Sequence, residues 1–250
     1  MNIRDILESH RRGDMTVEEA EKALRLDYLE NIDGHTVFDH ARRMRKNVPE
    51  VIYASSKTPE MTADIASASA MRGSVLVSRA SDGHFEAVRK RVSNAEYVRD
   101  ARMIVIGRPP EVVNGKVGII TAGSSDIPVA EEARIMAEHM GCATVSRYDV
   151  GVAGLHRILE PMKEMLDGDV DCIVVAAGME GALPAVVASL SPVPVIGVPT
   201  STGYGMGGGG EAALLCMLQT CSPGLTVVNI DNGIGAGAAA ALIATRRNKK

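Results

Sequence analysis

Short apolar runs alternate with amphipathic segments throughout the second half of the chain. Five runs have the near-continuous apolar character of buried strands, at residues 116–123, 143–150, 171–178, 194–200 and 225–231. A helical pattern follows each run, at residues 129–140, 156–166, 184–190, 210–220 and 235–246. Strands that are apolar on both faces and alternate with helices are typical of a parallel sheet that helices cover on both sides. The sequence therefore predicts a three-layer α/β domain in this half.

The first half has a less regular pattern, which predicts a smaller α/β domain. Residues 1–30 read as two short helices, and Thr16 with Glu19 has the spacing of a capping box at the start of the second. Thr58 followed by Pro59 is typical of a helix start, since Thr caps the first turn and Pro fits its first position. A strand, a helix and a strand follow, at residues 74–80, 84–92 and 101–107.

A loop-forming segment separates the two patterns. Residues 108–116 contain two consecutive prolines and an Asn-Gly turn. We place the boundary near residue 112, which gives an N-terminal domain over residues 1–111 and a C-terminal domain over residues 112–250.

Charge and cysteine content narrow the class of protein. The net charge of −4 offers no basic excess for a nucleic acid partner. The four cysteines have irregular spacing, which fits neither a disulfide framework nor a CxxC metal pair. The N-terminus is charged and helical rather than a signal peptide, and no apolar run has the length of a membrane span. We therefore expect a cytoplasmic protein without a membrane partner.

The most basic stretch of the chain lies in the N-terminal half. Its members are His40, Arg42, Arg43, Arg45, Lys46 and Lys57. A run of charges is commonly a solvated helix face. The alternative is a clamp for phosphate or carboxylate, since Arg offers a planar, bidentate donor pair. This alternative gains weight because the chain contains no Lys or Arg from Glu164 to Thr245.

Polar and glycine-rich sequences follow the five predicted strands. Ligands of parallel α/β sheets bind at the carboxyl ends of the strands, so these segments are expected to form one site. Ser124, Ser125 and Asp126 precede a helix, where they would either cap its first turn or help to hold an anion. Both roles are compatible.

Two further residues are candidates for chemistry. Glu180 is the only acid between Ile173 and Tyr204, and it is either a solvated loop residue or the acid or base of a site. Cys221 lies in a loop before Ser-Pro-Gly and is a candidate nucleophile, although the end of a helix disfavours a thiolate unless a cation lies close. The other three cysteines read as small apolar residues: Cys142, Cys172 and Cys216.

The sequence GIGAGA at residues 233–238 matches part of a dinucleotide-binding fingerprint. Such a site needs a further βαβ half and an acid about 20 residues on, and the chain ends too soon for both. We interpret these glycines as sites of close packing, either within the chain or against a partner subunit.

Several motifs together resemble the LarB family, the pyridinium-3,5-biscarboxylic acid mononucleotide synthases of nickel-pincer cofactor biosynthesis. They are TAGSSD, RYDVGVAGLHR, AAGMEGALP, GVPTSTGYG, the segment ending in CSPG, VVNIDNGIGAG and, in the first half, DHARRMRKNVPEVIYASSKTPE. The C-terminal half is also similar to the aminoimidazole ribonucleotide carboxylase (mutase) family. The resemblance covers about residues 35 to 242 and implies a flavodoxin-like, purine-carboxylase-like C-terminal domain. The run Gly207 to Gly210 departs from the family pattern.

The resemblance implies carboxylation of nicotinic acid adenine dinucleotide at C5 of the pyridinium ring, followed by hydrolysis of the phosphoanhydride to release AMP. Cys221 would add to the ring as the nucleophile and Glu180 would move the proton. Arg147 would hold a phosphate or carboxylate, and Asp149 would orient it or bind Mg²⁺. The substrate would also contact the loop residues Gly123, Ser124, Ser125, Asp126, Gly178, Gly181, Ser201 and Gly203.

Two other functions remain open from the sequence. One is the purine carboxylase activity itself, which needs neither Cys221 nor the first hundred residues, and the other is non-catalytic nucleotide binding. We expect no tightly bound cofactor, with CO2 as co-substrate and Mg²⁺ as the candidate metal. The resemblance also implies a homo-oligomer, an octamer in the purine enzymes.

Overall fold

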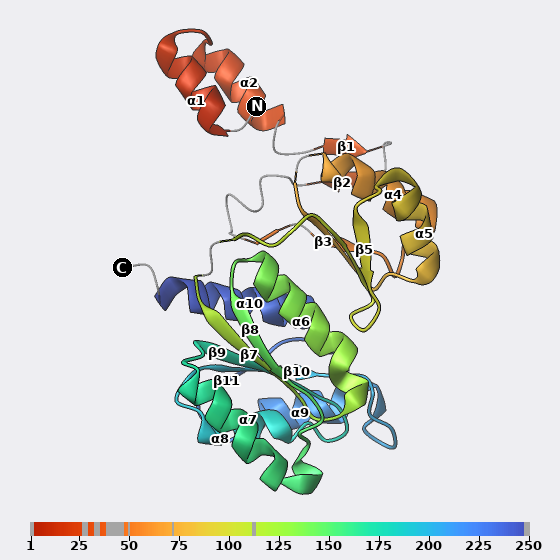
Figure 1. The fold of residues 1–250 in the computed structure, drawn as a ribbon, viewed down its shortest axis with the longest axis vertical. Helices are drawn as coiled ribbons and strands as arrows, with labels where there is room; N and C mark the ends of the chain where they lie inside the picture. Colours follow the sequence, from red (N-terminus) through yellow and green to blue (C-terminus); the bar gives the residue numbers. More distant parts are fainter. Residues whose placement is uncertain are drawn as a thin grey trace. The chain divides into compact units, whose positions relative to one another are not determined.

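The computed structural model describes residues 3–26, 30–32, 36–38, 48–49, 51–71, 73–111 and 114–247. The chain forms two compact units (Figure 1). The first consists of Met1–Tyr97 with Ile104–Gly107, and the second of Val98–Met103 with Arg108–Lys250.

The second unit is built on a five-stranded parallel sheet. Its strands are β7 (Lys116–Thr121), β8 (Ala143–Arg147), β9 (Cys172–Ala177), β10 (Val195–Pro199) and β11 (Leu225–Val227). They lie in the order β11-β10-β9-β7-β8, and every neighbouring pair is parallel. Numbered along the chain this is the order 2-1-3-4-5 of flavodoxin-like sheets. The predicted fold class is confirmed.

Helices cover both faces of this sheet (Figure 1). They are α6 (Ile127–His139), α7 (His156–Asp167), α8 (Leu183–Leu190), α9 (Glu211–Leu218) and α10 (Gly233–Arg247). One core contains Ile119 and Val174 of the sheet together with residues of α6 and α10. The other contains Ile120 and Val175 with residues of α7, α8 and α9. Neighbouring residues of one strand thus point into opposite cores, as the pleat requires.

The glycines of α10 allow its backbone to touch α6. A Cβ at Gly233 would lie 2.1 Å from the carbonyl oxygen of Val129, and one at Gly237 would lie 2.3 Å from that of Ala133. Real Cβ atoms do not make contacts of this length, so only glycine fits. The interpretation of GIGAGA as a close-packing sequence is confirmed, with the contact made inside the chain.

The first unit has shorter elements. Its helices are α1 (Ile3–Arg12), α2 (Val17–Leu26), α4 (Pro59–Ala70) and α5 (Asp82–Arg91). Its strands are β1 (Glu30–Ile32), β2 (Thr36–Phe38), β3 (Val51–Tyr53), β4 (Val75–Ser78) and β6 (Met103–Ile106), while β5 (Ala95–Val98) completes the order β3-β4-β6-β5.

The predicted helix starts of this unit are present. The Thr16 Oγ1 accepts a bond from the Glu19 N–H at 3.1 Å, and Glu19 Oε2 accepts one from the Thr16 N–H at 2.9 Å. The Thr58 hydroxyl accepts a bond from the Met61 N–H at 3.2 Å. The basic residues from His40 to Lys46 lie outside the described residues, so their role in holding a phosphate or carboxylate stays a prediction.

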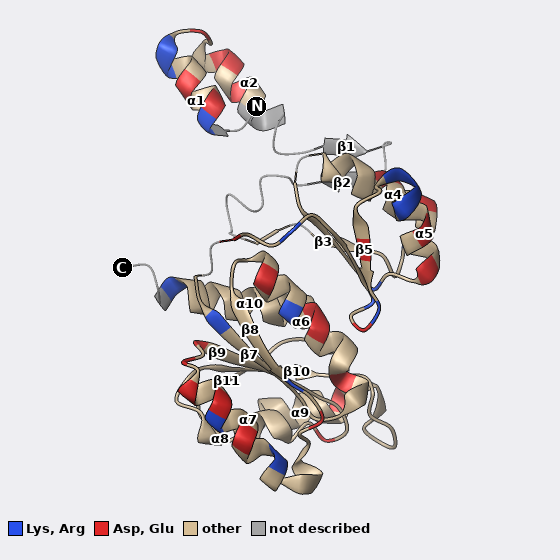
Figure 2. Cartoon of the chain, viewed as in Figure 1, with Lys and Arg blue, Asp and Glu red and all other residues tan. Residues whose placement is uncertain are grey.

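The segment without Lys and Arg in the sequence includes helices of the second unit. Figure 2 shows α9 and most of α10 without Lys or Arg. Among the described residues, no helix has both the length and the apolar character that a membrane span requires.

Candidate functional site

A cavity of about 310 Å³ lies where β7, β9 and β10 end, at the carboxyl edge of the sheet. Its lining comes from the loops after these strands and from the segment that precedes α7. The lining residues are Ala122, Gly123, Ser125, Asp126, Gly151, Val152, Ala153, Ala177, Gly178, Met179, Glu180, Ala182, Leu183, Thr202 and Tyr204. Two of them, Asp126 and Glu180, are acids, and none of these described residues is Lys or Arg.

Asp126 ties together two loops of the cavity. It closes the short turn Ser124–Asp126 before α6 and is 3% exposed. Its Oδ2 accepts a bond from the Gly123 N–H at 2.9 Å, and its Oδ1 accepts bonds from the hydroxyls of Thr200 at 2.6 Å and Thr202 at 2.9 Å. These partners hold the buried carboxylate in place, so Asp126 fixes the two loops that line the cavity rather than projecting freely into it.

The two threonines were missed by the sequence analysis, which selected Ser201 instead. Thr200 follows the last residue of β10 and Thr202 lies in the turn after it, and both hydroxyls donate to Asp126, whereas Ser201 between them has another partner. The Ser201 hydroxyl donates to Asp231 Oδ2 at 2.6 Å and is not part of the cavity lining. The Thr-x-Thr spacing at a strand end was the signal that could have identified the pair.

The hydroxyls of Thr200 and Thr202 leave no room for a side chain at Gly178. A Cβ at Gly178 would lie 2.4 Å from the Thr202 Oγ1 and 2.9 Å from the Thr200 Oγ1. A Cβ at Gly203 would lie 2.9 Å from the Met179 backbone nitrogen. The loops after β9 and β10 therefore approach each other as closely as backbones allow, and both predicted glycines serve this approach.

Glu180 lies in the lining with an exposed side chain. The residue before it, Met179, has φ of +49°, and Gly181 after it has φ of +68°. A Cβ at Gly181 would lie 2.7 Å from the Ala213 Cα, which fixes this turn against α9. The backbone on both sides of Glu180 is thus held in an unusual conformation, and its carboxylate faces both cavity and water.

Ser124 and Ser125 are exposed at the start of α6. Ser125 lines the cavity and Ser124 is its chain neighbour. Hydroxyls at a helix N-terminus suit an anion because the helix dipole and the first N–H groups favour negative charge. This arrangement fits the predicted contact with a phosphate.

Arg147 and Asp149 lie beside the cavity and not in its lining. The Arg147 guanidinium pairs with Glu164 and donates to the Ser146 carbonyl at 2.7 Å. Asp149 has φ of +59°, its N–H donates to the Thr121 hydroxyl, and its Oδ2 accepts a bond from Arg157 at 3.4 Å. A carboxylate that faces a guanidinium is a poor Mg²⁺ ligand, and the described residues contain no group of three or more His, Cys, Asp and Glu placed to hold a metal.

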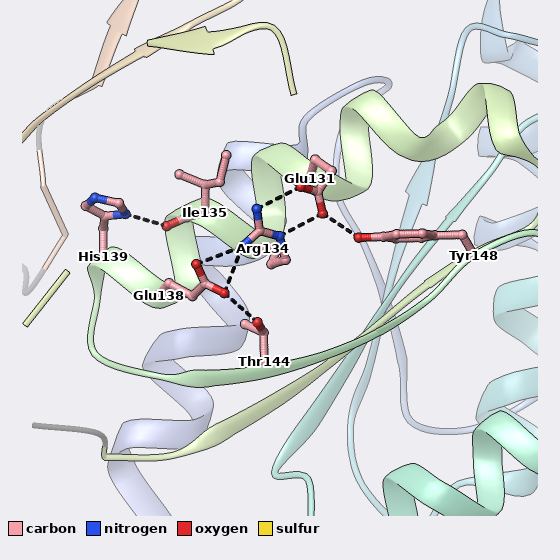
Figure 3. A network of polar contacts seen from close by, with 7 residues as sticks. All are labelled: Glu131, Arg134, Ile135, Glu138, His139, Thr144 and Tyr148. Atoms are coloured by element: carbon pink, nitrogen blue, oxygen red, sulfur yellow. Dashed lines mark hydrogen bonds and ion pairs between the residues drawn. The ribbon is translucent and has the colours of Figure 1, made fainter. Parts of the chain in front are cut away.

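α6 is joined to β8 and its following loop by a polar clamp, a network of contacts among Glu131, Arg134, Glu138, Thr144 and Tyr148 (Figure 3). The Arg134 guanidinium contacts Glu131 Oε1 at 2.7 Å and Glu138 Oε2 at 2.8 Å. The Tyr148 hydroxyl donates to Glu131, and the Thr144 hydroxyl donates to Glu138 at 2.7 Å. Burial disfavours the charge of Glu131, but the bonds from Arg134 and Tyr148 outweigh it and lower the pKa of Glu131. The clamp was not anticipated from the sequence.

The cysteines divide into buried and accessible thiols. Burial raises the pKa of Cys142 to about 11 and that of Cys172 to about 12, so both are inert apolar residues as predicted. Cys216 is partly buried on α9, and Cys221 is exposed.

Cys221 lies at the opposite edge of the sheet from the cavity. It belongs to the loop that enters β11, and the Gly224 carbonyl in this loop accepts a bond from the N–H of Val195, the first residue of β10. The cavity begins beyond the last residue of β10, and five residues of strand span roughly 16 Å. A single chain therefore does not bring Cys221 and Glu180 together, because one precedes the strands and the other follows them.

Comparison with known proteins gives two matches to family models. Residues 116–250 match the model described as AIR carboxylase, and residues 29–108 match the LarB/PurE-like N-terminal domain. An uncharacterised protein of Methanocaldococcus jannaschii is 43% identical over 256 residues, which cover 99% of both chains. The N5-carboxyaminoimidazole ribonucleotide mutase of Pyrococcus abyssi is 33% identical over 146 residues, 57% of this chain and 75% of that protein. The same enzyme of M. jannaschii is 35% identical over 127 residues, 50% and 74% of the two chains.

Proposed function

This chain belongs to the AIR carboxylase family and carries a LarB/PurE-like N-terminal domain, and from this premise we propose that it carboxylates the pyridinium ring of nicotinic acid adenine dinucleotide at C5 and hydrolyses the phosphoanhydride to release AMP. The observation that carries the proposal is the charge of the cavity. Its described lining contains no Lys or Arg and two acids, of which Glu180 is exposed and Asp126 is buried and bonded within the protein, and this negative charge suits a cationic ring. The exposed hydroxyls of Ser124 and Ser125, at the start of α6, would bind the phosphate in the nicotinic acid mononucleotide half of the substrate.

The chemistry starts with a thiolate, because an electron-poor pyridinium cannot attack CO2. Addition of the Cys221 sulfur at C4 forms a C–S bond and gives a neutral dihydropyridine, whose C5 is nucleophilic. C5 then attacks CO2 and forms the new C–C bond. A base removes the C5 proton, and departure of the thiolate restores the aromatic ring. The ring returns to its original oxidation level, so the carboxylation needs no oxidant.

Glu180 is the proposed base for the C5 proton. Its carboxylate lies in the cavity lining, and the backbone turns at Met179 and Gly181 fix its position. Water also reaches this side chain, which gives the proton a route out after turnover. Arg147 and Asp149 would contact only the part of the dinucleotide that extends beyond the cavity.

The position of Cys221 requires a second copy of the chain in this proposal. The thiol is exposed and therefore available to a neighbouring protomer, whereas its own cavity lies at the far edge of its own sheet. In a homo-oligomer, Cys221 of one protomer would enter the cavity that holds Glu180 of another. The catalytic site would then be complete only in the assembly.

The proposal is tested by product analysis with ¹³C-bicarbonate. The protein is incubated with nicotinic acid adenine dinucleotide, and the mononucleotide product and AMP are measured by mass spectrometry. We expect one labelled carboxyl group per mononucleotide and its loss in Cys221→Ala. A parallel incubation with aminoimidazole ribonucleotide serves as the comparison, because labelling of that substrate alone would replace this proposal with the purine activity. Binding of either nucleotide without labelled product would indicate a non-catalytic protein.

A further inference from the structure

Tyr204 is the only aromatic residue in the described lining of the cavity. The chain has only five Tyr, two Phe and no Trp, so an aromatic ring at this place stands out from its composition. Its side chain is 79% exposed. Tyrosine rings usually bury much of their surface, so a ring this exposed beside a cavity has a face available for a ligand in that cavity.

Two glycines flank Tyr204, and their surroundings differ. Gly203 precedes it and Gly205 follows it with φ of +81°, and no atom lies within 4 Å of the position of a Cβ at Gly205. Met206, two residues on, is fully exposed and does not line the cavity. The backbone is thus packed against Met179 before Tyr204 and open after it, which places Tyr204 next to the loop that contains Glu180.

The charges of the cavity identify the ring that would fit. Glu180 contributes a carboxylate to the lining, and the described lining contains no cation that would compete for the face of Tyr204. An aromatic face attracts a cation, and a planar cationic ring gains both this attraction and stacking. On the basis of the function proposed above, we propose that Tyr204 and Glu180 form the subsite that recognises the cationic pyridinium ring, with Tyr204 stacking on its face.

Binding measured without bicarbonate tests this subsite separately from turnover. Nicotinic acid mononucleotide is the probe, and ribose 5-phosphate is the control ligand because it has the sugar and phosphate but no ring. We expect Tyr204→Leu to weaken binding of the mononucleotide by about 3- to 30-fold in calorimetry and Tyr204→Phe to retain it. Ribose 5-phosphate should bind all three proteins equally. Unchanged affinity of Tyr204→Leu for the mononucleotide would overturn the subsite, and so would a parallel loss of both ligands, which indicates a structural role.

A fluorescence experiment gives a second measurement that does not depend on loss of binding. Because the chain has no Trp, the Tyr204→Trp variant carries a single indole, whose emission a stacked pyridinium quenches. Met206→Trp is the matched control from the same loop, outside the lining. We expect saturable quenching by the mononucleotide in the first variant alone. Equal, non-saturable quenching in both would contradict stacking.

The two proposals can fail separately. If the wild-type protein binds the mononucleotide with Tyr204-dependent affinity but yields no labelled product, the subsite stands and the proposed reaction fails. If labelled product forms and Tyr204→Leu changes neither affinity nor KM, the reaction stands and the subsite fails.

Discussion

At the scale of single residues, the cavity depends on a close contact between Gly178 and two threonine hydroxyls. Asp126 holds both hydroxyls from the other side, so they cannot retreat without losing a bond to a buried carboxylate. The shape of the cavity therefore depends on the absence of a side chain at Gly178.

Replacing Gly178 with alanine tests this contact. The added methyl would lie 2.4 Å from the Thr202 Oγ1, so we expect Gly178→Ala to cost about 1–3 kcal/mol in the free energy of unfolding and to weaken nucleotide binding. Urea denaturation and calorimetry measure the two effects. Gly208→Ala is the control, since its Cβ would meet nothing closer than 3.7 Å, and it should change stability by less than about 0.5 kcal/mol. Equal stability and binding in the two variants would contradict this prediction, because the loops would then move apart at little cost in free energy.

Sequence patterns predicted the region of the site better than its individual contacts. The rule that ligands bind at strand carboxyl ends selected the loops containing Ser125, Glu180 and Gly178, and these three residues line the cavity. It could not distinguish Ser201 from Thr202, because that choice depends on how the turn after β10 directs the two hydroxyls, one to Asp231 and the other to Asp126. The ion pair of Arg147 was also beyond the sequence, since it joins residues 17 positions apart.

At the scale of elements, the polar clamp on α6 stabilises the start of the loop that leads from β8 to the cavity. Tyr148 belongs to that loop and Glu131 to α6, and their bond joins the two elements. The lowered pKa of Glu131 means that the folded protein prefers its ionised form.

The clamp predicts a specific pH dependence of stability. The pKa of Glu131 falls below its ordinary value of 4.5 on folding, so its contribution is complete above pH 4.5 and is lost as the pH falls further. Glu131→Gln should therefore be less stable than wild type by roughly 1–3 kcal/mol at pH 7, and the difference should shrink below pH 4.5. Urea denaturation from pH 7 to pH 3 measures it.

An exposed ion pair supplies the control. Glu164 pairs with Arg147, and both side chains are more than two-fifths exposed. Glu164→Gln should change the unfolding free energy by less than about 1 kcal/mol at any pH in this range. A difference for Glu131→Gln that stays constant with pH would mean that the clamp does not depend on the ionised carboxylate.

Element positions in the second unit were predictable because each buried strand and amphipathic helix has its own periodicity. The strands of the first unit were harder to recognise. β3 and β1 have three residues each, too few for a hydrophobic pattern to establish a strand. β3 also pairs with β4, a partner distant in the sequence, whereas β1 pairs with the neighbouring β2.

At the scale of the whole molecule, the proposed site is divided between protomers. Cys221 and Glu180 lie at opposite edges of one sheet, so each chain would contribute a thiol to one site and a carboxylate to another. In this arrangement the exposed Cys221 reacts with a ligand bound in the cavity of a neighbouring protomer, because the cavity of its own chain lies too far away.

Mixing two inactive variants tests the shared site. Cys221→Ala and Glu180→Gln should each lose labelled product, whereas oligomers formed from both after partial unfolding and refolding should regain part of the activity. Such oligomers contain some sites with both wild-type residues. The control is each variant refolded alone. No recovery in mixed oligomers of confirmed composition would contradict a site that combines residues of two protomers.

In the proposed reaction the Cys221 sulfur forms a bond with the substrate ring, and the mass of the intact protein measures this bond directly. The wild-type protein is incubated with nicotinic acid adenine dinucleotide without bicarbonate, quenched and analysed by mass spectrometry with peptide mapping. The account predicts an adduct of the dinucleotide or its mononucleotide on Cys221, retained in Cys216→Ala and absent in Cys221→Ala. An adduct on another residue, or substrate turnover by Cys221→Ala at the wild-type rate, would contradict it.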